Sequence, residues 1–261
     1  MTHLFKPRIH AHETEILEFF GGDVSKTRIT SKLPGKGVFV LFSNRCGSNY
    51  LVELMKQLPT LTMRNEIFNA QTVTQVCTNR GFNDFDHYLR FMRRGCKTPH
   101  WGAKLGCIQL DMVQRFGLFD AFQEGAHLIW LKRKNVVAQA VSLYIAHHNR
   151  QWASFHKVQG ETPPYNFRDI KAIAGAVLRN NMDAELSLSL LNIPYHALWY
   201  EDYLADTDQH MRRIADYLGE PYAPVDETLS DFKQQTDPIK TEYEERFREQ
   251  ARNRLDIENL R

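Results

Sequence analysis

Short apolar runs alternate along the chain with stretches in which apolar residues recur at helical spacing. Continuous runs of the kind seen in strands buried on both faces occupy residues 37–43, 126–132 and 194–200, and a shorter run occupies residues 100–105. A helical pattern follows each of the three longer runs. This alternation predicts an α/β fold in which helices flank a parallel β-sheet.

The predicted helices have recognisable starts. Asn135 can cap a helix after residues 126–132, and Asp206 or Thr207 can cap one after residues 194–200. A long helix is expected over residues 170–191. The segment before it, residues 151–167, predicts a long loop, which would be either a functional lid or a crossing linker.

Composition and charge add few constraints. The 261 residues are 43% apolar and 25% charged, which is typical of one globular domain over residues 1–261. With 33 basic and 31 acidic side chains, the formal net charge of +2 does not favour nucleic acid as a partner, so any anion site must come from a local arrangement. The polar C-terminal segment, about residues 238–261, predicts a helical tail that is either solvated or bound to a partner.

The cysteines and the hydropathy of the sequence indicate the cellular compartment of the protein. The four cysteines, Cys46, Cys77, Cys96 and Cys107, include no C-x-x-C pair, so neither zinc nor a redox dithiol is expected. Free thiols are typical of a reducing compartment. The start of the sequence lacks the compact apolar run of a signal peptide, and no stretch approaches the roughly eighteen apolar residues that cross a bilayer. The sequence therefore predicts a cytoplasmic protein without a transmembrane segment.

A glycine-containing turn follows the first predicted strand, at the edge of the sheet where α/β proteins bind ligands. Within residues 43–48, Gly47 permits close approach of the backbone, and the start of the next helix offers unpaired amides to an anion. Arg45, Ser48 and Asn49 add a positive charge and further donors. The turn is not a Walker A loop, which needs a lysine where this chain has Ser48.

A second cationic turn ends the strand predicted at residues 126–132. Lys132, Arg133 and Lys134 follow one another there, and Ser142 lies on the next predicted helix. If both turns lie at one edge of the sheet, two anion sites face the same crevice, as a donor with phosphate groups at its 5′ and 3′ positions requires. A solvated basic strand end is the alternative interpretation.

Four segments point to one family of enzymes. FSNRCGSNYLVELM, residues 42–55, is similar to the 5′-phosphosulfate loop of bacterial sulfotransferases of the trehalose 2-sulfotransferase type. KRKNVVAQAVSLYIA, residues 132–146, is similar to their 3′-phosphate segment. NEIF, residues 65–68, resembles the segment with the proposed catalytic carboxylate, and residues 198–219 resemble the Tyr-Glu-Asp segment and its helix. The resemblance covers about residues 37–219, with gaps.

The resemblance implies a P-loop-like sulfotransferase fold and the sulfuryl donor 3′-phosphoadenosine 5′-phosphosulfate (PAPS). The residues that would hold the 5′-phosphosulfate are Arg45, Cys46, Gly47, Ser48 and Asn49. Arg133 and Ser142 would bind the 3′-phosphate, and Glu66 would be the general base. Cys46 replaces the family's usual small hydroxyl residue, which removes one expected hydrogen bond. A guanidinium suits Arg45 to a catalytic role, because it can pair with two oxygens as charge builds on the leaving group.

The implied reaction is an in-line displacement on sulfur that needs no metal, because backbone amides and a cation can neutralise the developing charge. The family also implies a saccharide or glycolipid hydroxyl as the acceptor, and a homodimer. Two alternatives remain open. One is a P-loop-like phosphotransferase, which the missing Walker lysine opposes. The other is a catalytically inactive nucleotide-binding scaffold, which Glu66 opposes.

Further residues near these motifs have two interpretations each. Lys104 could assist near the sulfuryl group, and Glu53 could act as the base or pair with another side chain. Cys46 is expected to be a reactive thiol, because Arg45 and a helix start favour the thiolate. The strand that leads to Glu66 is expected to lie directly beside the first strand.

The histidines and tryptophans are assigned mainly to structure. His147 and His148 are expected to cap the C-terminus of a helix. The tryptophans of strand patterns, expected in the core, are Trp101, Trp130 and Trp199. Trp152, in the loop at residues 151–167, could line an acceptor cleft.

Overall fold

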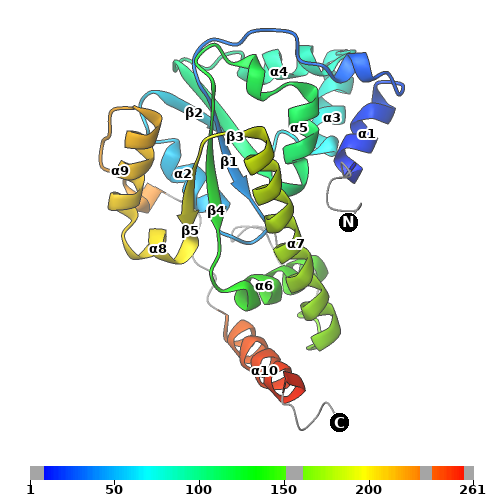
Figure 1. The fold of residues 1–261 in the computed structure, drawn as a ribbon, viewed down its shortest axis with the longest axis vertical. Coiled ribbons are helices and arrows are strands. Elements are labelled where there is room, and N and C mark those ends of the chain that lie inside the picture. The colour runs from blue at the N-terminus through cyan, green and yellow to red at the C-terminus, as the bar shows by residue number, and fades with distance from the viewer. Residues whose placement is uncertain (1–8, 151–160, 230–236, 256–261) are drawn as a thin grey trace.

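The computed structural model describes residues 9–150, 161–229 and 237–255. Within them, five strands form one parallel sheet in the order β2-β3-β1-β4-β5 (Figure 1). The strands are β1 (Gly37–Phe42), β2 (Leu61–Arg64), β3 (His100–Gly106), β4 (Ala126–Lys132) and β5 (Tyr195–Trp199). The predicted α/β fold is therefore confirmed, and each of the four apolar runs forms a strand.

The central strand, β1, is buried along its whole length and divides the core in two. Phe39 and Leu41 point into one hydrophobic cluster, whereas Val38 and Val40 point into the other. This alternation places every residue of the strand in an apolar environment, which explains its continuous apolar sequence. The sheet is thus covered on both faces.

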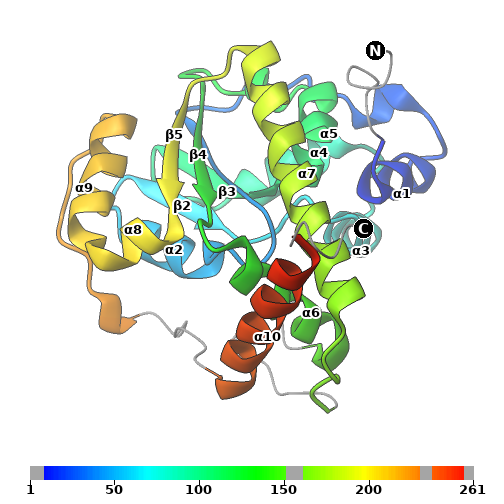
Figure 2. The ribbon, with the colours of Figure 1, turned by 60° about the horizontal axis from the view of Figure 1, so that its bottom comes forward.

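Helices from different parts of the chain cover the two faces (Figures 1 and 2). One face carries α1 (Ala11–Phe19), α3 (Ala70–Arg80), α4 (Phe85–Arg93), α5 (Leu110–Phe116) and α7 (Phe167–Leu191). The other carries α2 (Ser48–Met55), α8 (Tyr200–Ala205) and α9 (Thr207–Leu218). Beyond the carboxyl ends of the strands lie α6 (Val136–Asn149) and α10 (Pro238–Leu255). Within the described residues, no helix combines the length and the apolar character that crossing a bilayer requires.

Side-chain caps fix the helix starts. Asn135 accepts a hydrogen bond from the Ala138 amide, and Asp206 accepts one from Gln209, so both predicted caps are confirmed. The long helix α7 begins at Phe167, before the expected residue 170, because the Asn166 side chain caps it. Of the predicted loop at residues 151–167, residues 151–160, with Trp152, lie outside the described residues.

Two expectations from the sequence are wrong. β2 pairs with β3, and β3 separates it from β1, so the strand before Glu66 is not beside the first strand. Trp101 and Trp130 are core residues, but Trp199 is 36% exposed because β5 is the edge strand. The helix expected in the C-terminal segment is present as α10, and of the two alternatives simple solvation does not hold, because Tyr243 and Phe247 are buried against α6 and α7.

Candidate active site

The turn from β1 to α2 lies at the carboxyl edge of the sheet and adopts two left-handed residues. Gly47 has a φ of 89°, and a Cβ at this position would lie 2.4 Å from the Tyr200 ring. Only glycine therefore fits between the turn and α8. Arg45 has a φ of 67°, which is uncommon for a residue with a side chain. α2 begins at Ser48, so the amides of its first turn have no partners within the helix and can bind an anion.

The two cationic turns meet in the structure. Arg45 Nε donates a hydrogen bond of 3.0 Å to Ser142 Oγ on α6. Arg133 Nη1 donates one of 3.0 Å to the Arg45 carbonyl oxygen. Burial lowers the pKa of the Arg45 guanidinium, and the nearby charge of Arg133 lowers it further. The two half-buried guanidinium groups, so close together, create a positive electrostatic potential that favours the binding of an anionic group.

Arg133 is the member of the basic strand end that faces the turn. Lys132 Nζ instead lies over the Trp130 and Trp199 rings, 4.1 and 4.8 Å from their centroids. Lys134 Nζ pairs with Asp202 at the surface. The alternative of a wholly solvated strand end therefore fits Lys134 but not Arg133.

Two further side chains hold the turns together. The Glu201 carboxylate accepts hydrogen bonds from the amides of Lys134, at 2.9 Å, and Asn135, at 3.0 Å, and so fixes the start of α6. The Gln139 amide donates to Ser43 Oγ at 3.0 Å and to the Asn44 carbonyl at 2.8 Å. Sequence reasoning assigned no role to Gln139, although it stands inside the Gln-Ala-Val-Ser-Leu stretch that carries the resemblance.

Glu66 lies at the same edge of the sheet and is joined to the first turn through Lys104. Lys104 Nζ, on β3, donates a hydrogen bond of 2.6 Å to Glu66 Oε1 and another to Asn49 Oδ1 on α2. The Lys104 side chain is 2% exposed, whereas that of Glu66 is 40% exposed. Asn69 Nδ2 donates to the other carboxylate oxygen of Glu66 at 3.0 Å. The carboxylate is thus oriented from both sides and still reached by solvent.

The charge state of Glu66 follows from these contacts. Burial raises the pKa of its carboxyl group, but the charge of Lys104 and the hydrogen bonds from Lys104 and Asn69 outweigh burial, so the pKa lies below its usual range. Glu66 is therefore an anion at neutral pH and can accept a proton. Lys104, which sequence reasoning placed only near the sulfuryl group, is the cation that sets this state.

The prediction that Cys46 is a reactive thiol is wrong. Its side chain is fully buried in the cluster under α2, and burial raises the pKa of the thiol to about 11. The positive charges of Lys104 and Arg133 only partly oppose this effect. Cys46 is therefore a protonated core thiol and not a reactive thiolate.

Other candidate residues have structural partners. Glu53 pairs with Lys56 at 2.5 Å on α2. The His148 ring nitrogen lies 2.9 Å from the Tyr144 carbonyl oxygen at the end of α6.

Lys240, in the first turn of α10, is a further cation near the two turns, and the sequence analysis did not identify it. Burial lowers the pKa of its ammonium, and the charges of Arg45 and Arg133 lower it further, so it is a third cation of this region.

Two solved structures with a similar fold are a sulfotransferase and a sulfotransferase domain. The sulfotransferase domain from the Synechococcus PCC 7002 olefin synthase is similar with a TM-score of 0.55 at 16% identity, over 84% of this chain and 90% of that one. A sulfotransferase from Alicyclobacillus acidocaldarius is similar with a TM-score of 0.51 at 16% identity, over 88% of this chain and 97% of that one. No protein-family profile matches the chain, and no curated protein matches it significantly. The chain thus has the P-loop-like sulfotransferase fold.

Proposed function

We propose that the protein is a sulfotransferase that moves a sulfuryl group from PAPS to a hydroxyl group. The observation that carries the proposal is the meeting of the two cationic turns, in which Arg45 bonds to Ser142 and Arg133 bonds to Arg45. The two neighbouring turns would then offer an anion site at the start of α2 and another at the start of α6, which suits a nucleotide with both 5′ and 3′ phosphate groups.

In the proposed reaction, the acceptor oxygen attacks sulfur in line with the bond to the nucleotide phosphate. A bond forms between that oxygen and sulfur, the bond from sulfur to the bridging oxygen breaks, and the phosphate leaves with the electron pair. Glu66 takes the hydroxyl proton, since its anionic carboxylate is exposed and oriented by Lys104 and Asn69. Arg45 and the amides at the start of α2 stabilise the charge on the leaving oxygen.

The finer assignments rest on the sequence resemblance. It favours a saccharide or glycolipid hydroxyl as the acceptor and a homodimer, whereas the proposal of a single catalytic domain rests on the chain length. A screen of saccharide and glycolipid acceptors with a radiolabelled sulfate donor, with and without a chelator, tests the acceptor and the proposed independence of metal ions together.

Thermal unfolding tests the donor site. We expect 3′,5′-ADP to raise the melting temperature in the presence of EDTA, because a ligand of the native state stabilises it by mass action. 5′-AMP, which lacks the 3′-phosphate, should raise it far less. Equal shifts for the two nucleotides would remove the role of Arg133 and Ser142. A shift only with ATP and magnesium would favour the phosphotransferase alternative.

A further inference from the structure

The outward side of α7 carries a basic and apolar stripe. Six exposed residues at helical spacing form it, and we name them the α7 stripe: Arg168, Lys171, Leu178, Arg179, Met182 and Leu190. Arg168 and Lys171 lie in the first turns of the helix, Leu178, Arg179 and Met182 lie near its middle, and Leu190 lies near its end. Leu178, Met182 and Leu190 are 54%, 52% and 64% exposed. Figure 2 shows α7 with α10 packed beside its start.

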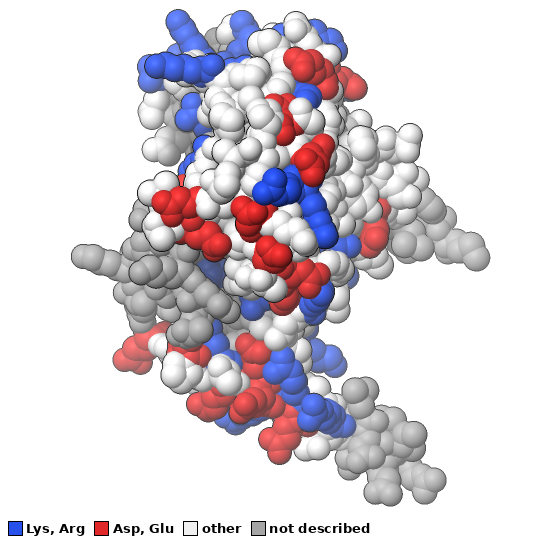
Figure 3. Space-filling model, turned by 90° about the vertical axis from the view of Figure 1, so that its left-hand side faces the viewer, with Lys and Arg blue, Asp and Glu red and all other residues white. Residues whose placement is uncertain are grey.

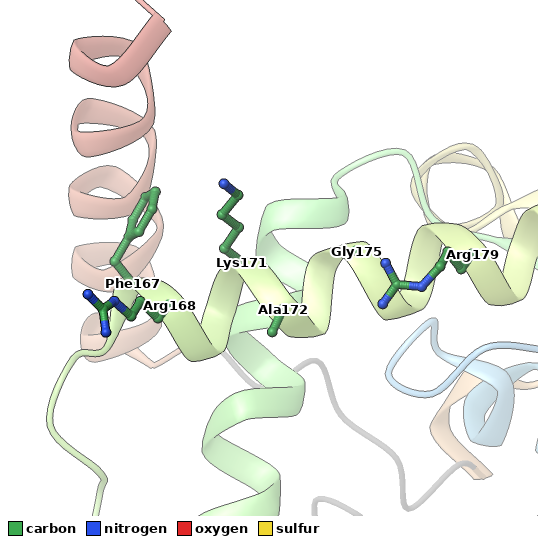
Figure 4. Close-up of a pocket in the computed structure, with 6 residues that line it drawn as sticks. All are labelled: Phe167, Arg168, Lys171, Ala172, Gly175 and Arg179. Atoms are coloured by element: carbon green, nitrogen blue, oxygen red, sulfur yellow. The ribbon is translucent and has the colours of Figure 1, made fainter. Parts of the chain in front are cut away.

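The cations of the stripe face a common hollow. Arg168, Lys171 and Arg179, with Phe167, Ala172 and Gly175, line a shallow pocket of about 400 Å³ (Figure 4). Gly175 leaves room for a guanidinium over the helix backbone, since an added Cβ would lie 3.2 Å from Arg179 Nη1. Among the described residues, none of the three cations forms an ion pair.

The charge pattern differs from that of the face with α8 and α9. There, basic and acidic side chains stand beside one another, and pairs such as Arg212 with Asp208 form (Figure 3). The α7 stripe contains no acidic residue; at helical spacing, Asp169, Asp183 and Glu185 fall on its flanks. A surface that is complementary to the stripe must therefore supply negative charge and also tolerate apolar side chains.

We propose that the α7 stripe binds the surface of an anionic lipid bilayer. Lipid phosphate groups pair with Arg168, Lys171 and Arg179, and the apolar side chains of Leu178 and Met182 enter the headgroup region. A second copy of the chain fits less well, because a two-fold contact that pairs the stripe with itself would bring like charges together, and neither stripe contains an acidic residue. The proposal concerns binding, goes beyond the proposed function, and does not depend on sulfuryl transfer.

Such binding would orient the candidate active site. Phe167, at the start of α7, is buried with residues of α6 and α10, and its ring stacks on that of Phe247 at 4.8 Å. α6 in turn begins at the turn that carries Arg133. The start of the stripe is therefore joined through packed side chains to α6, and the rest of it runs back along the sheet toward the start of β5 (Figure 1). A bilayer bound along the stripe would hold the molecule in one orientation.

Vesicle co-sedimentation tests the proposal. The full chain should bind vesicles of equimolar phosphatidylcholine and phosphatidylglycerol, and bind phosphatidylcholine alone weakly. The variant Arg168→Glu/Lys171→Glu/Arg179→Glu should bind the mixed vesicles at least roughly a hundredfold more weakly, since each cation contributes about a fivefold factor near an anionic surface. If circular dichroism shows that this variant is misfolded, the three glutamine substitutions replace it.

A matched variant separates the stripe from net charge. Lys26→Glu/Lys97→Glu/Arg213→Glu changes three exposed cations elsewhere by the same total charge and should bind as the unchanged protein does. Leu178→Ser/Met182→Ser should weaken binding without a change in charge. The proposal is overturned if the unchanged protein ignores the mixed vesicles or if both charge variants lose binding equally.

Two further results would assign the stripe to another occupant. One is a dimer in analytical ultracentrifugation that Leu178→Ser/Met182→Ser dissociates, which would make the stripe a contact between two copies. The other is release from vesicles by soluble glycerophosphate, at an ionic strength at which sodium chloride releases nothing, which would make the pocket a site for free phosphate esters.

Discussion

The two sides of the candidate active site differ in how their polar groups are held. On the donor side, formed by the turns after β1 and β4, Arg45, Arg133 and Gln139 each bond to a neighbouring element, so several contacts fix one geometry. On the side of β2 and β3, a single buried ammonium, Lys104, joins Asn49 to Glu66. Changes on the donor side should therefore act on binding, and changes on the other side on chemistry and its pH dependence.

The largest effect is expected from Glu66→Gln. A change in nucleotide binding by this variant would contradict the division of roles between the two sides. Glutamine keeps the shape and hydrogen bonds of the side chain but cannot take the acceptor proton. Loss of a general base costs about 10²–10⁴-fold in rate, so kcat should fall by that factor while the dissociation constant of 3′,5′-ADP stays the same. Single-turnover kinetics and nucleotide titration measure the two quantities.

Glu53→Gln is the matched control, because Glu53 is also a carboxylate on the helix that follows the first turn, but it pairs with Lys56. It should leave the chemical step unchanged. A near-normal step in Glu66→Gln together with a slow one in Glu53→Gln would move the base to Glu53.

The next effect is expected from Arg133→Ala and concerns the donor side. The change removes a hydrogen-bonding cation from the crevice, which should weaken 3′,5′-ADP binding by about 1.5–3 kcal/mol, or roughly ten- to a hundredfold in the dissociation constant. Lys134→Ala, next in the chain, removes a cation that pairs with Asp202 instead and should bind normally. Isothermal titration of both variants with 3′,5′-ADP measures the affinities. An equal loss of affinity in the two variants would mean that the strand end acts only through its total charge.

Much of the fold could be predicted because the local pattern and the packing agree. Each apolar run forms a strand, since both faces of a parallel sheet need apolar side chains, and Asn135 and Asp206 cap helices where the polar pattern places them. Strand order could not be predicted, because β2 carries no signal that distinguishes β1 from β3 as its neighbour. Exposure of Trp199 follows from that same long-range order, which makes β5 an edge.

The candidate site was predictable where a motif fixes it and not where distant residues meet. Arg45, Arg133 and Ser142 lie in two recognisable segments, and the structure brings them together. The bridge from Lys104 to Glu66 depends on residues of different strands, and the sequence alone did not indicate it. The direction of the Cys46 side chain was also missed, because it depends on packing beneath α2.

The smallest effect is expected from Lys104→Met. It tests the role of the β2/β3 side through the pH dependence of kcat and not through the size of kcat. Lys104 keeps the pKa of Glu66 below its usual range, so the base stays ionised and the rate should persist as the pH falls through the ordinary range of glutamate. In Lys104→Met, burial of Glu66 acts without the opposing cation, so its pKa rises and the acid limb of kcat should move to higher pH. Lys56→Met removes a cation near Glu53 instead and should leave the limb in place. The pH–rate profiles of both variants, recorded with saturating donor and after thermal unfolding has verified the fold, measure the shift. A limb that moves in Lys56→Met and not in Lys104→Met would show that the proton goes to Glu53 and that Lys104 serves only to hold Asn49 and the donor side.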